Sequence, residues 1–442
     1  MRCSVVVAAS WLWAGALGCG GGVTLAIDGD LAVPAELDAI CVGVGDRDLA
    51  GGAFGRHYRL TDRLASLPQT LAVEPGSASA ALAWAQGYRG GAVVAQASGA
   101  LDFGADKTLR LDRCPGATAG ALVTSAPVAA PAGRVVASMG PGGTVAIALD
   151  ATGAVVLDVA GGALVAAAAP IAGGDAVVAA DLDGDCADDL AVARAGVVEL
   201  WWRRGTTFTP GPVLATAAAA VAAGDLDYDG DLDLVIGAGA TITVWRNDGA
   251  GGFAPAGGAV DTRSAVTAVT ALAIGDLDGD GHADLVVGQA GAPLVALLGD
   301  PAGAGILTAN AAVFSAAPRT VGALALGDLD GDGDKDVVAT VAGAGPRVYL
   351  NRAGLLEDQT FVRLPPLGPT TAVAIGDWDG DCLPDLVTAG QPSQALRGAG
   401  DASQLDDGTL GPASAVVGAD LDDDGAADRV LIGPDGARWV HR

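Results

Sequence analysis

The sequence predicts an all-β protein, and three observations support this class. Short apolar runs rich in β-branched residues recur along the chain, and turns rich in Gly, Asp and Pro separate them, which is typical of strands joined by tight turns. The apolar residues are mostly Ala, Val and Leu, since 51% of the 442 residues are hydrophobic but only 4% are aromatic. Such small side chains favour thin, closely packed sheets. Finally, acidic segments of one pattern return at regular intervals, which indicates an internal repeat.

The charge balance limits the classes of partner. The chain has 52 acidic and 24 basic residues, which gives a formal net charge of -28. We therefore expect no nucleic acid among its partners, because the chain has no basic surface to displace counterions from phosphates. Three histidines, His57, His282 and His441, are too few for a His-rich metal centre.

Residues 1–19 predict an export signal. Arg2 precedes an apolar run from Val5 to Leu17, which is typical of a secretory signal peptide. The ending from Ala16 to Cys19 resembles a bacterial lipobox, with Ala16 where that motif usually has Leu. The resemblance implies that Cys19 is lipidated and is the only membrane attachment; cleavage nearby by another peptidase is the alternative. We expect a lipoprotein of the bacterial outer membrane or cell surface, or else a periplasmic or secreted protein.

Residues 20–114 predict a small β-sandwich. Apolar or alternating runs about ten residues apart, from Val23 to Leu111, are spaced like strands and resemble immunoglobulin-like modules. Cys41 and Cys114 lie in or beside expected strands. Export to an oxidising compartment favours a disulfide between them, which would stabilise the domain by roughly 4 kcal/mol. Two unpaired cysteines are the alternative.

Six acidic segments organise residues 131–442. Their first aspartates are separated by 44, 51, 52, 49 and 43 residues. Short apolar runs flank the segments, for example Ala271–Ile274 and Leu285–Val287. A third strand follows and contains Trp201, Trp202 or Trp245. A fourth strand is expected to carry a phenylalanine in several copies, namely Phe208, Phe253, Phe314 and Phe361. Four strands in a repeat of about 45 residues are typical of a β-propeller blade.

A seventh, degenerate copy precedes the acidic ones. Val135–Met139 aligns with Val177–Asp181, about 42 residues further on, but the loop after it lacks the acidic residues. Seven blades fit residues 131–442, and six blades with a spare hairpin is the competing count. Residues 115–130 form an expected linker and closing strand. We expect Ala121–Thr124 to pair beside Ala437–His441, because this would cover an otherwise open sheet edge.

The acidic loops have the composition of a calcium site. Aspartate occupies positions 1, 3, 5 and 9 of each loop, and position 6 is Gly in four copies but Cys186 or Cys382 in two. Position 7 varies freely, as a backbone carbonyl ligand allows. Calcium takes six to eight oxygen ligands, whereas the strict octahedral geometry of magnesium suits such a loop less well. Six complete copies argue against simple Asp-Gly turns, which one copy alone would allow.

The candidate ligands are, loop by loop, Asp181, Asp183, Asp185, Ala187 and Asp189; Asp225, Asp227, Asp229, Asp231 and Asp233; Asp276, Asp278, Asp280, His282 and Asp284; Asp328, Asp330, Asp332, Asp334 and Asp336; Asp377, Asp379, Asp381, Leu383 and Asp385; and Asp420, Asp422, Asp424, Ala426 and Asp428.

These repeats resemble the FG-GAP and VCBS families, whose calcium-loop blades also occur in integrin α-subunit propellers. The strand ending from Trp245 to Gly249 supports the resemblance, which covers residues 131–442. It implies one calcium ion per loop, about six in all. The closing acid at position 9 and the flanking strands exclude an EF-hand. The predicted fold class is therefore all-β: a seven-bladed β-propeller with six calcium loops and one degenerate blade, preceded by a small β-sandwich.

The sequence favours a binding function over catalysis. It contains no GxSxG or HExxH motif and no histidine beside a cysteine. The 24 aspartates at positions 1, 3, 5 and 9 of the loops are assigned as ion ligands, which argues against a glycosidase carboxylate pair. We expect a non-enzymatic, monomeric, calcium-binding propeller scaffold at the cell surface that binds a surface protein or a glycan in adhesion or recognition. A glycan-binding lectin and a propeller-based hydrolase or lyase are the alternatives.

Overall fold

A computed structural model of the chain describes residues 23–29, 39–45, 55–59, 67, 69–73, 80–89, 92–102, 106–113, 123–138 and most of 145–441. Within the last range it leaves out 161, 181, 184–187, 206, 228–231, 259, 263–264, 279–281, 301–305, 311–318, 331–333, 353, 377, 379–382, 400, 420 and 422–427. In the described part, no helix has the length and apolar character needed to cross a membrane.

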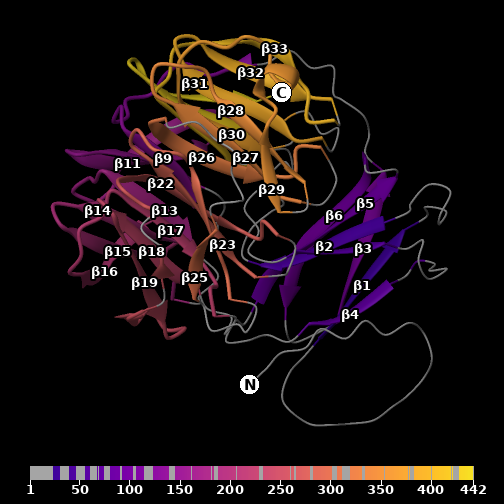
Figure 1. Cartoon of the computed structure of the whole chain (residues 1–442). Coiled ribbons are helices and arrows are strands. Elements are labelled where there is room, and N and C mark those ends of the chain that lie inside the picture. Colours follow the sequence, from indigo (N-terminus) through magenta and orange to yellow (C-terminus); the bar gives the residue numbers. More distant parts are fainter. Residues whose placement is uncertain are drawn as a thin grey trace.

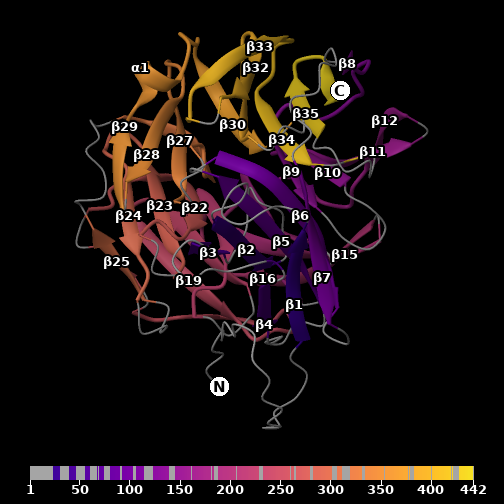
Figure 2. The same cartoon turned by 90° about the vertical axis from the view of Figure 1, so that its right-hand side faces the viewer.

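Seven antiparallel sheets are arranged around a ring, so the protein is an all-β, seven-bladed propeller (Figures 1 and 2). The first strands of neighbouring blades contact one another all the way round, from β9 to β34 and back to β9, and therefore line the centre of the ring. The degenerate repeat forms a complete blade, which decides the count in favour of seven. Blade 1 contains β9 (Arg134–Ser138), β10 (Val145–Asp150), β11 (Gly153–Ala160) and β12 (Ala163–Ala168).

The six acidic repeats form blades 2 to 7. Blade 2 contains β13 (Ala176–Ala180), β14 (Asp189–Arg194), β15 (Val197–Arg204) and β16 (Thr207–Leu214). Blade 3 contains β17 (Ala220–Gly224), β18 (Asp233–Ala238), β19 (Thr241–Asn247) and β20 (Phe253–Pro255). Blade 4 contains β22 (Val269–Gly275), β23 (Asp284–Gln289), β24 (Val295–Leu298) and β25 (Leu307–Asn310), with β21 (Val260–Asp261) added in parallel beside β25.

The remaining blades are 5, 6 and 7. Blade 5 contains β26 (Val321–Gly327), β27 (Asp336–Val341), β28 (Arg347–Arg352) and β29 (Leu355–Asp358). Blade 6 contains β30 (Thr370–Gly376), β31 (Asp385–Gly390), β32 (Ser393–Gly398) and β33 (Gln404–Leu410). Blade 7 contains β34 (Ala415–Ala419), β35 (Asp428–Gly433) and β36 (Gly436–His441), and its fourth strand is β8 (Val123–Thr124).

The ring is closed by the segment that precedes the first blade, as the sequence predicted. Thr124 pairs with Val440 and Val123 with His441. An additional bridge joins Val128 to Ala437, whose amides donate to each other's carbonyl oxygens at 2.9 and 2.8 Å. Blade 7 therefore combines three strands from the C-terminal end of the chain with one strand that precedes blade 1. This fourth strand covers the edge of β36.

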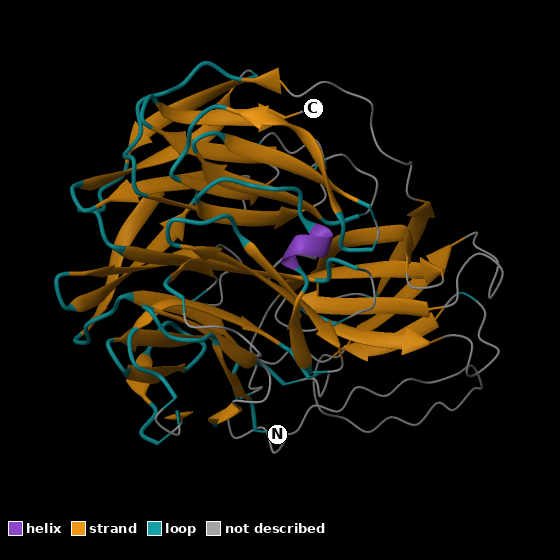
Figure 3. Cartoon of the chain, turned by 45° about the horizontal axis from the view of Figure 1, so that its top comes forward, coloured by secondary structure: helices purple, strands orange, loops and turns teal. Residues whose placement is uncertain are grey.

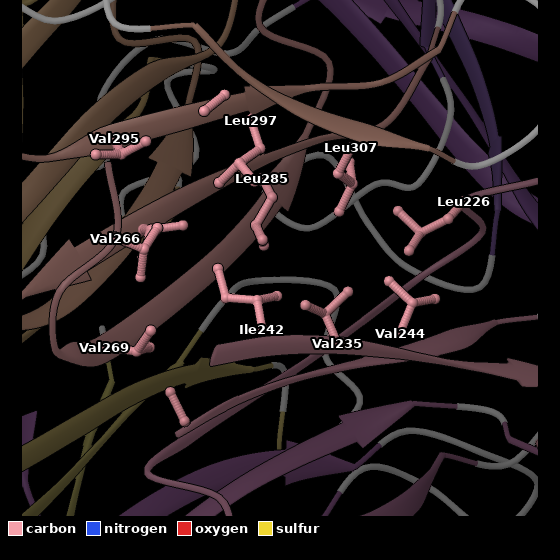
Figure 4. Packing of buried hydrophobic residues seen from close by; sticks show 13 residues of the cluster. Leu226, Val235, Ile242, Val244, Val266, Val269, Leu285, Val295, Leu297 and Leu307 are labelled. Atoms are coloured by element: carbon pink, nitrogen blue, oxygen red, sulfur yellow. The ribbon is translucent and has the colours of Figure 1, made fainter. Parts of the chain in front are cut away.

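The blades are held together by apolar side chains on both faces of the second strands. In β23, β27 and β31 every residue is buried, which explains the apolar run that follows the aspartate at the start of each strand. Between blades 3 and 4, Val235 and Ile242 pack against Leu285, Val295 and Leu297 (Figure 4). Each such interface buries branched aliphatic residues from two sheets.

Small residues allow the sheets to approach closely. A Cβ atom at Gly224 would lie 2.8 Å from Ile274 of the next blade, and one at Gly418 would lie 2.0 Å from the ring of Trp378. A Cβ atom this close would force the neighbouring buried side chain to shift, so these positions favour glycine. The glycine-rich composition thus has a packing role as well as a role in turns.

The fourth strands correct one expectation. Phe208 lies in β16 and Phe253 in β20, as predicted, and Phe314 lies outside the described residues. Phe361 is wrong, because it lies in the short helix α1 (Thr360–Arg363), seen in purple in Figure 3. The Oδ1 atom of Asp358 accepts hydrogen bonds from the amide and the hydroxyl of Thr360. This Asx turn ends β29 before Phe361 is reached.

The N-terminal strands are connected through β7 (Lys107–Arg113), whose residues Lys107–Leu111 pair with β1 and whose residues Asp112 and Arg113 pair with β6. The expected β-sandwich stays a prediction. The strand order is β3-β2-β5-β6-β7-β1-β4, and β1 runs parallel to β7. In Figure 2 this sheet lies in front of the ring. The strands are β1 (Val23–Gly29), β2 (Ala39–Gly45), β3 (Gly55–Arg59), β4 (Gln69–Val73), β5 (Ala80–Arg89), β6 (Ala92–Asp102) and β7 (Lys107–Arg113).

The predicted disulfide lies outside what the structure describes. The backbone of Cys41 lies in β2, but its side chain is not described, and Cys114 falls outside the described residues. The disulfide between Cys41 and Cys114 therefore stays a prediction. The same holds for the signal peptide and Cys19.

Candidate metal centres

The position-9 aspartate of each acidic loop is the first residue of the second strand. These six aspartates are at most 3% exposed. They are Asp189, Asp233, Asp284, Asp336, Asp385 and Asp428. Because each starts a strand that is buried on both faces, its carboxylate points back to the loop from within the blade interface.

Backbone amides hold this buried carboxylate from two sides. In blade 5, the Oδ2 atom of Asp336 accepts from the amide of Leu329 at position 2 of the loop, and its Oδ1 atom accepts from the amide of Asn351 at the end of the third strand, both at 2.7 Å. In blade 4, Asp284 makes the same pair of bonds with Leu277 and Gly299, again at 2.7 Å. These bonds fix the closing ligand of the loop relative to two strands.

Two loops bring three carboxylates close enough to share one ion. Asp276, Asp278 and Asp284 in blade 4 offer oxygens that all lie within 4.8 Å of one another, and so do Asp328, Asp330 and Asp336 in blade 5. The contributors come from positions 1, 3 and 9, as the sequence predicted. Three hard oxygen donors around one point match the preference of calcium.

Burial and mutual repulsion raise the pKa of the closing carboxylates. Burial is the largest cause, and it raises the pKa of Asp336 to about 8. It raises the pKa of Asp284 to about 7, and that of Asp233 to about 6. The neighbouring loop carboxylates add to the effect, whereas the backbone hydrogen bonds oppose it. A divalent cation would favour the charged form of these carboxylates and would therefore lower their pKa.

Arginines at the end of the third strands reach the position-3 carboxylates. Arg204 lies 2.7 Å from Asp183, and Arg352 lies 2.6 Å from Asp330. In blade 3, Arg246 contacts Asp227 at 3.0 Å and Asp233 at 2.6 Å. Each guanidinium partly neutralises the negative charge of the acidic loop in its own blade.

Some buried carboxylate oxygens in the loops could serve as ligands to a cation. Among the described residues, the Oδ1 atoms of Asp183 and Asp330 are buried and have no hydrogen-bond partner, although the other oxygen of each side chain meets an arginine. A buried carboxylate oxygen without a partner is costly unless a cation or a donor satisfies it. The donor set of these loops is therefore compatible with a calcium ion.

The structure describes the predicted ligands only in part. It places Asp183, Asp189, Asp225, Asp227, Asp233, Asp276, Asp278, His282, Asp284, Asp328, Asp330, Asp334, Asp336, Leu383, Asp385 and Asp428 in or beside the loops. The other candidates lie outside the described residues, namely Asp181, Asp185, Ala187, Asp229, Asp231, Asp280, Asp332, Asp377, Asp379, Asp381, Asp420, Asp422, Asp424 and Ala426. For these the assignment stays a prediction.

Known repeats match the first five of the six acidic loops. The FG-GAP-like repeat matches residues 181–236, 225–287 and 328–388, and the FG-GAP repeat matches residues 268–308. Residues 181–308 and 328–388 thus consist of FG-GAP repeats, and for this part of the propeller the resemblance drawn from the aspartate spacing is confirmed.

More distant similarities come from solved structures. One is a lectin from Agrocybe aegerita that recognises non-reducing terminal N-acetylglucosamine, with 18% sequence identity, a TM-score of 0.48 and coverage of 70% of this chain and 86% of that chain. Another is BBS1N in complex with ARL6DN, with 13% identity, a TM-score of 0.47 and coverage of 72% and 94%. Similarity at this level says nothing about the ligand of this chain. No curated protein matches the sequence.

Proposed function

We propose that this chain is a calcium-binding, non-catalytic propeller scaffold that recognises a protein or a glycan outside the cell. The observation that carries the proposal is the gathering of three carboxylates from positions 1, 3 and 9 in blades 4 and 5, within 4.8 Å of one another. Like charges at such distances repel one another, and a calcium ion offsets the repulsion. The same spacing in six loops supports about six ions.

Counting bound ions tests the proposal. Native mass spectrometry of the full chain, titrated with calcium chloride, should count about six calcium ions, in line with one ion per loop. Asp276→Asn and Asp328→Asn should each remove one ion, because each takes a charged ligand from a different loop. Asp358→Asn is a matched control, since Asp358 bonds Thr360 at the start of α1 instead of a loop. A wild-type chain that binds no calcium at millimolar concentration would overturn the proposal.

Export and anchoring are part of the same proposal, because millimolar calcium is found outside cells. Acyl labelling of the full chain in a bacterial host tests the role of Cys19. Cys19→Ser should lose the label and leave the membrane fraction, whereas Cys3→Ser within the same apolar leader should keep both properties. A soluble, unlabelled wild type contradicts the anchor.

Recognition is tested with the calcium-loaded chain. A glycan array and a pull-down from cell-surface extracts, each run with calcium and with chelator, distinguish the two classes of ligand. Calcium-dependent selectivity for one glycan class supports the lectin alternative, whereas a single protein recovered only with calcium supports the protein scaffold. Hydrolysis or elimination of a bound glycan would contradict the non-catalytic assignment.

A further inference from the structure

Two asparagines connect acidic loops that belong to neighbouring blades. Asn351 is the penultimate residue of β28 in blade 5 and is fully buried, and Asn247 ends β19 in blade 3 and is 7% exposed. The amide Nδ2 of Asn351 donates to the carbonyl of Leu277 in the blade 4 loop at 2.7 Å. The Nδ2 atom of Asn247 donates to the carbonyl of Leu182 in the blade 2 loop at 3.0 Å. Each side chain therefore crosses a blade interface.

Each asparagine also holds the loop of its own blade. The second proton of Nδ2 bonds the carbonyl of Lys335 at 3.0 Å for Asn351, and the carbonyl of Leu232 at 3.1 Å for Asn247. Their backbone amides donate to the closing carboxylates of Asp336 and Asp233 at 2.7 and 3.0 Å. Each asparagine is thus bonded to the closing aspartate of the loop in its own blade. It is also bonded to the carbonyl between the first two aspartates of the loop in the preceding blade.

The turns that follow these asparagines cover the loop of the preceding blade. The Oδ1 atom of Asn351 accepts from the amide of Gly354 at 2.9 Å. A Cβ atom at Gly354 would lie 3.3 Å from the Cβ of Asp278. In blade 3 the Oδ1 atom of Asn247 accepts from the amide of Gly249 at 3.2 Å, and a Cβ atom at Gly251 would lie 3.3 Å from the Cβ of Asp183. The connection between neighbouring loops therefore occurs twice, through the same side-chain hydrogen bonds.

Blades 4 and 6 have glycine at the same structural position. The amides of Gly299 and Gly398 donate to Asp284 and Asp385 at 2.7 Å, as the asparagine amides do in their blades. A glycine has no side chain to reach the preceding loop. A Cβ atom at Gly299 would lie only 2.7 Å from the carbonyl oxygen of Ala283, so the position excludes a larger residue. Among the described residues, the asparagine bridge is consequently absent between blades 3 and 4 and between blades 5 and 6.

We propose that Asn351 couples the calcium loops of blades 4 and 5, that Asn247 couples those of blades 2 and 3, and that ions bind cooperatively within each pair and independently across Gly299. This inference rests on the proposed calcium binding. An ion in blade 5 fixes Asp336 and with it the backbone of Asn351. The ordered side chain then holds Leu277, whose neighbours Asp276 and Asp278 bind the ion of blade 4. The coupling is reciprocal, because each ion favours the arrangement that the other needs.

Hydrogen exchange read at each loop as a function of calcium concentration tests the coupling in the full chain. Peptides covering residues 274–287 and 326–339 report the calcium midpoints of blades 4 and 5. Asp328→Asn removes a ligand in blade 5 and should also raise the midpoint of blade 4 about three- to tenfold, as the loss of one buried hydrogen bond implies. In the Asn351→Gly background, Asp328→Asn should leave the blade 4 midpoint unchanged. The double-mutant comparison separates coupling from a general loss of stability.

The chain offers internal controls. Asn247→Gly should uncouple blades 2 and 3 and leave blades 4 and 5 coupled. Asp278→Asn in blade 4 should shift blade 5 but leave the loop of blade 3 unchanged, since Gly299 separates them. An Asp328→Asn effect confined to blade 5, or one that persists at blade 4 after Asn351→Gly, overturns the role of Asn351. A wild type in which no loop responds to calcium overturns the proposed function as well.

Discussion

At the residue scale, a buried aspartate begins the second strand of each acidic blade. Without an ion, burial raises the pKa of Asp336 to about 8 and that of Asp284 to about 7. In the folded state these carboxyl groups hold a proton up to a higher pH than in the unfolded state, in which their pKa is near 4. Unfolding at neutral pH therefore releases protons. The contribution of these carboxyl groups to stability is thus fully present at low pH and is lost as the pH rises through the folded-state pKa.

We therefore expect the free energy of unfolding of the calcium-depleted protein to fall between about pH 4 and pH 8. Calcium should reverse the slope over the lower part of this range, because protons compete with the ion for the same oxygens. Thermal melts at pH 5, 6.5 and 8, with and without calcium, measure both slopes. Asp336→Asn removes one titrating group and should flatten the slope of the depleted protein. A depleted protein that is most stable at pH 8 would contradict this account.

The arginines next to the loops act in competition with the ion. Arg352 is 43% exposed and lies 2.6 Å from Asp330, so its attraction is partly screened by water. Arg352→Gln should tighten calcium binding about two- to fivefold, which corresponds to an exposed ion pair of at most about 1 kcal/mol. Calorimetric titration measures the change. Arg438→Gln is the control, because Arg438 bonds the carbonyl of Pro412 instead of a loop; equal effects of the two substitutions would argue against the competition.

The candidate site was predictable from the sequence as far as it is local. The spacing of aspartates at positions 1, 3 and 9 was sufficient to predict the cluster of Asp276, Asp278 and Asp284. It was insufficient to predict Asn351, which reaches a carbonyl 74 residues away in the preceding blade. An asparagine at the end of the third strand in two repeats was the available signal, but its partner depends on how adjacent sheets are placed.

At the scale of the elements, the sequence predicted the blades because each second strand contains a short apolar run that is buried on both faces. The order of strands in the N-terminal sheet was not predictable, since seven short runs of similar composition allow many pairings. Phe361 was assigned to a strand on composition alone, although the turn at Asp358 and Thr360 ends the strand earlier. Composition indicates where strands are favoured, but local hydrogen bonding decides where they end.

The closing strand can be tested at this scale. Val128→Pro removes the amide that donates to Ala437 at 2.9 Å. The substitution should lower the melting temperature by about 2–4 °C and accelerate hydrogen exchange at residues 436–441, because the edge of blade 7 loses a partner. Ala129→Pro is the matched control, since the amide of Ala129 makes no hydrogen bond in the described part of the chain. Unchanged exchange in blade 7 after Val128→Pro would show that the closure does not depend on this bridge.

At the scale of the whole molecule, charge is concentrated in the ring. Positions 1, 3, 5 and 9 of the six loops hold 24 aspartates, against a formal net charge of -28 for the chain. Ions in all six loops would add twelve positive charges, and they would join segments of the chain that otherwise repel one another. Ion binding to the folded state alone contributes about 2.7 kcal/mol per site at a hundredfold excess over the dissociation constant.

Chelation should therefore lower the melting temperature of the full chain by roughly 10–25 °C, as several such sites in a domain of this size imply. If repulsion between the loops causes this loss of stability, sodium chloride should raise the melting temperature of the chelated protein. It should have much less effect on the calcium-loaded protein. The reason is that the screening length falls from about 10 Å at 0.1 M to about 3 Å at 1 M salt. Scanning calorimetry in chelator and in calcium, each at low and high salt, separates the two contributions. Potassium chloride at the same ionic strength should act like sodium chloride, since screening depends on charge and concentration alone. A melting curve that chelator leaves unchanged would mean that the ring is stable without ions, and that its cohesion comes from the apolar interfaces between blades.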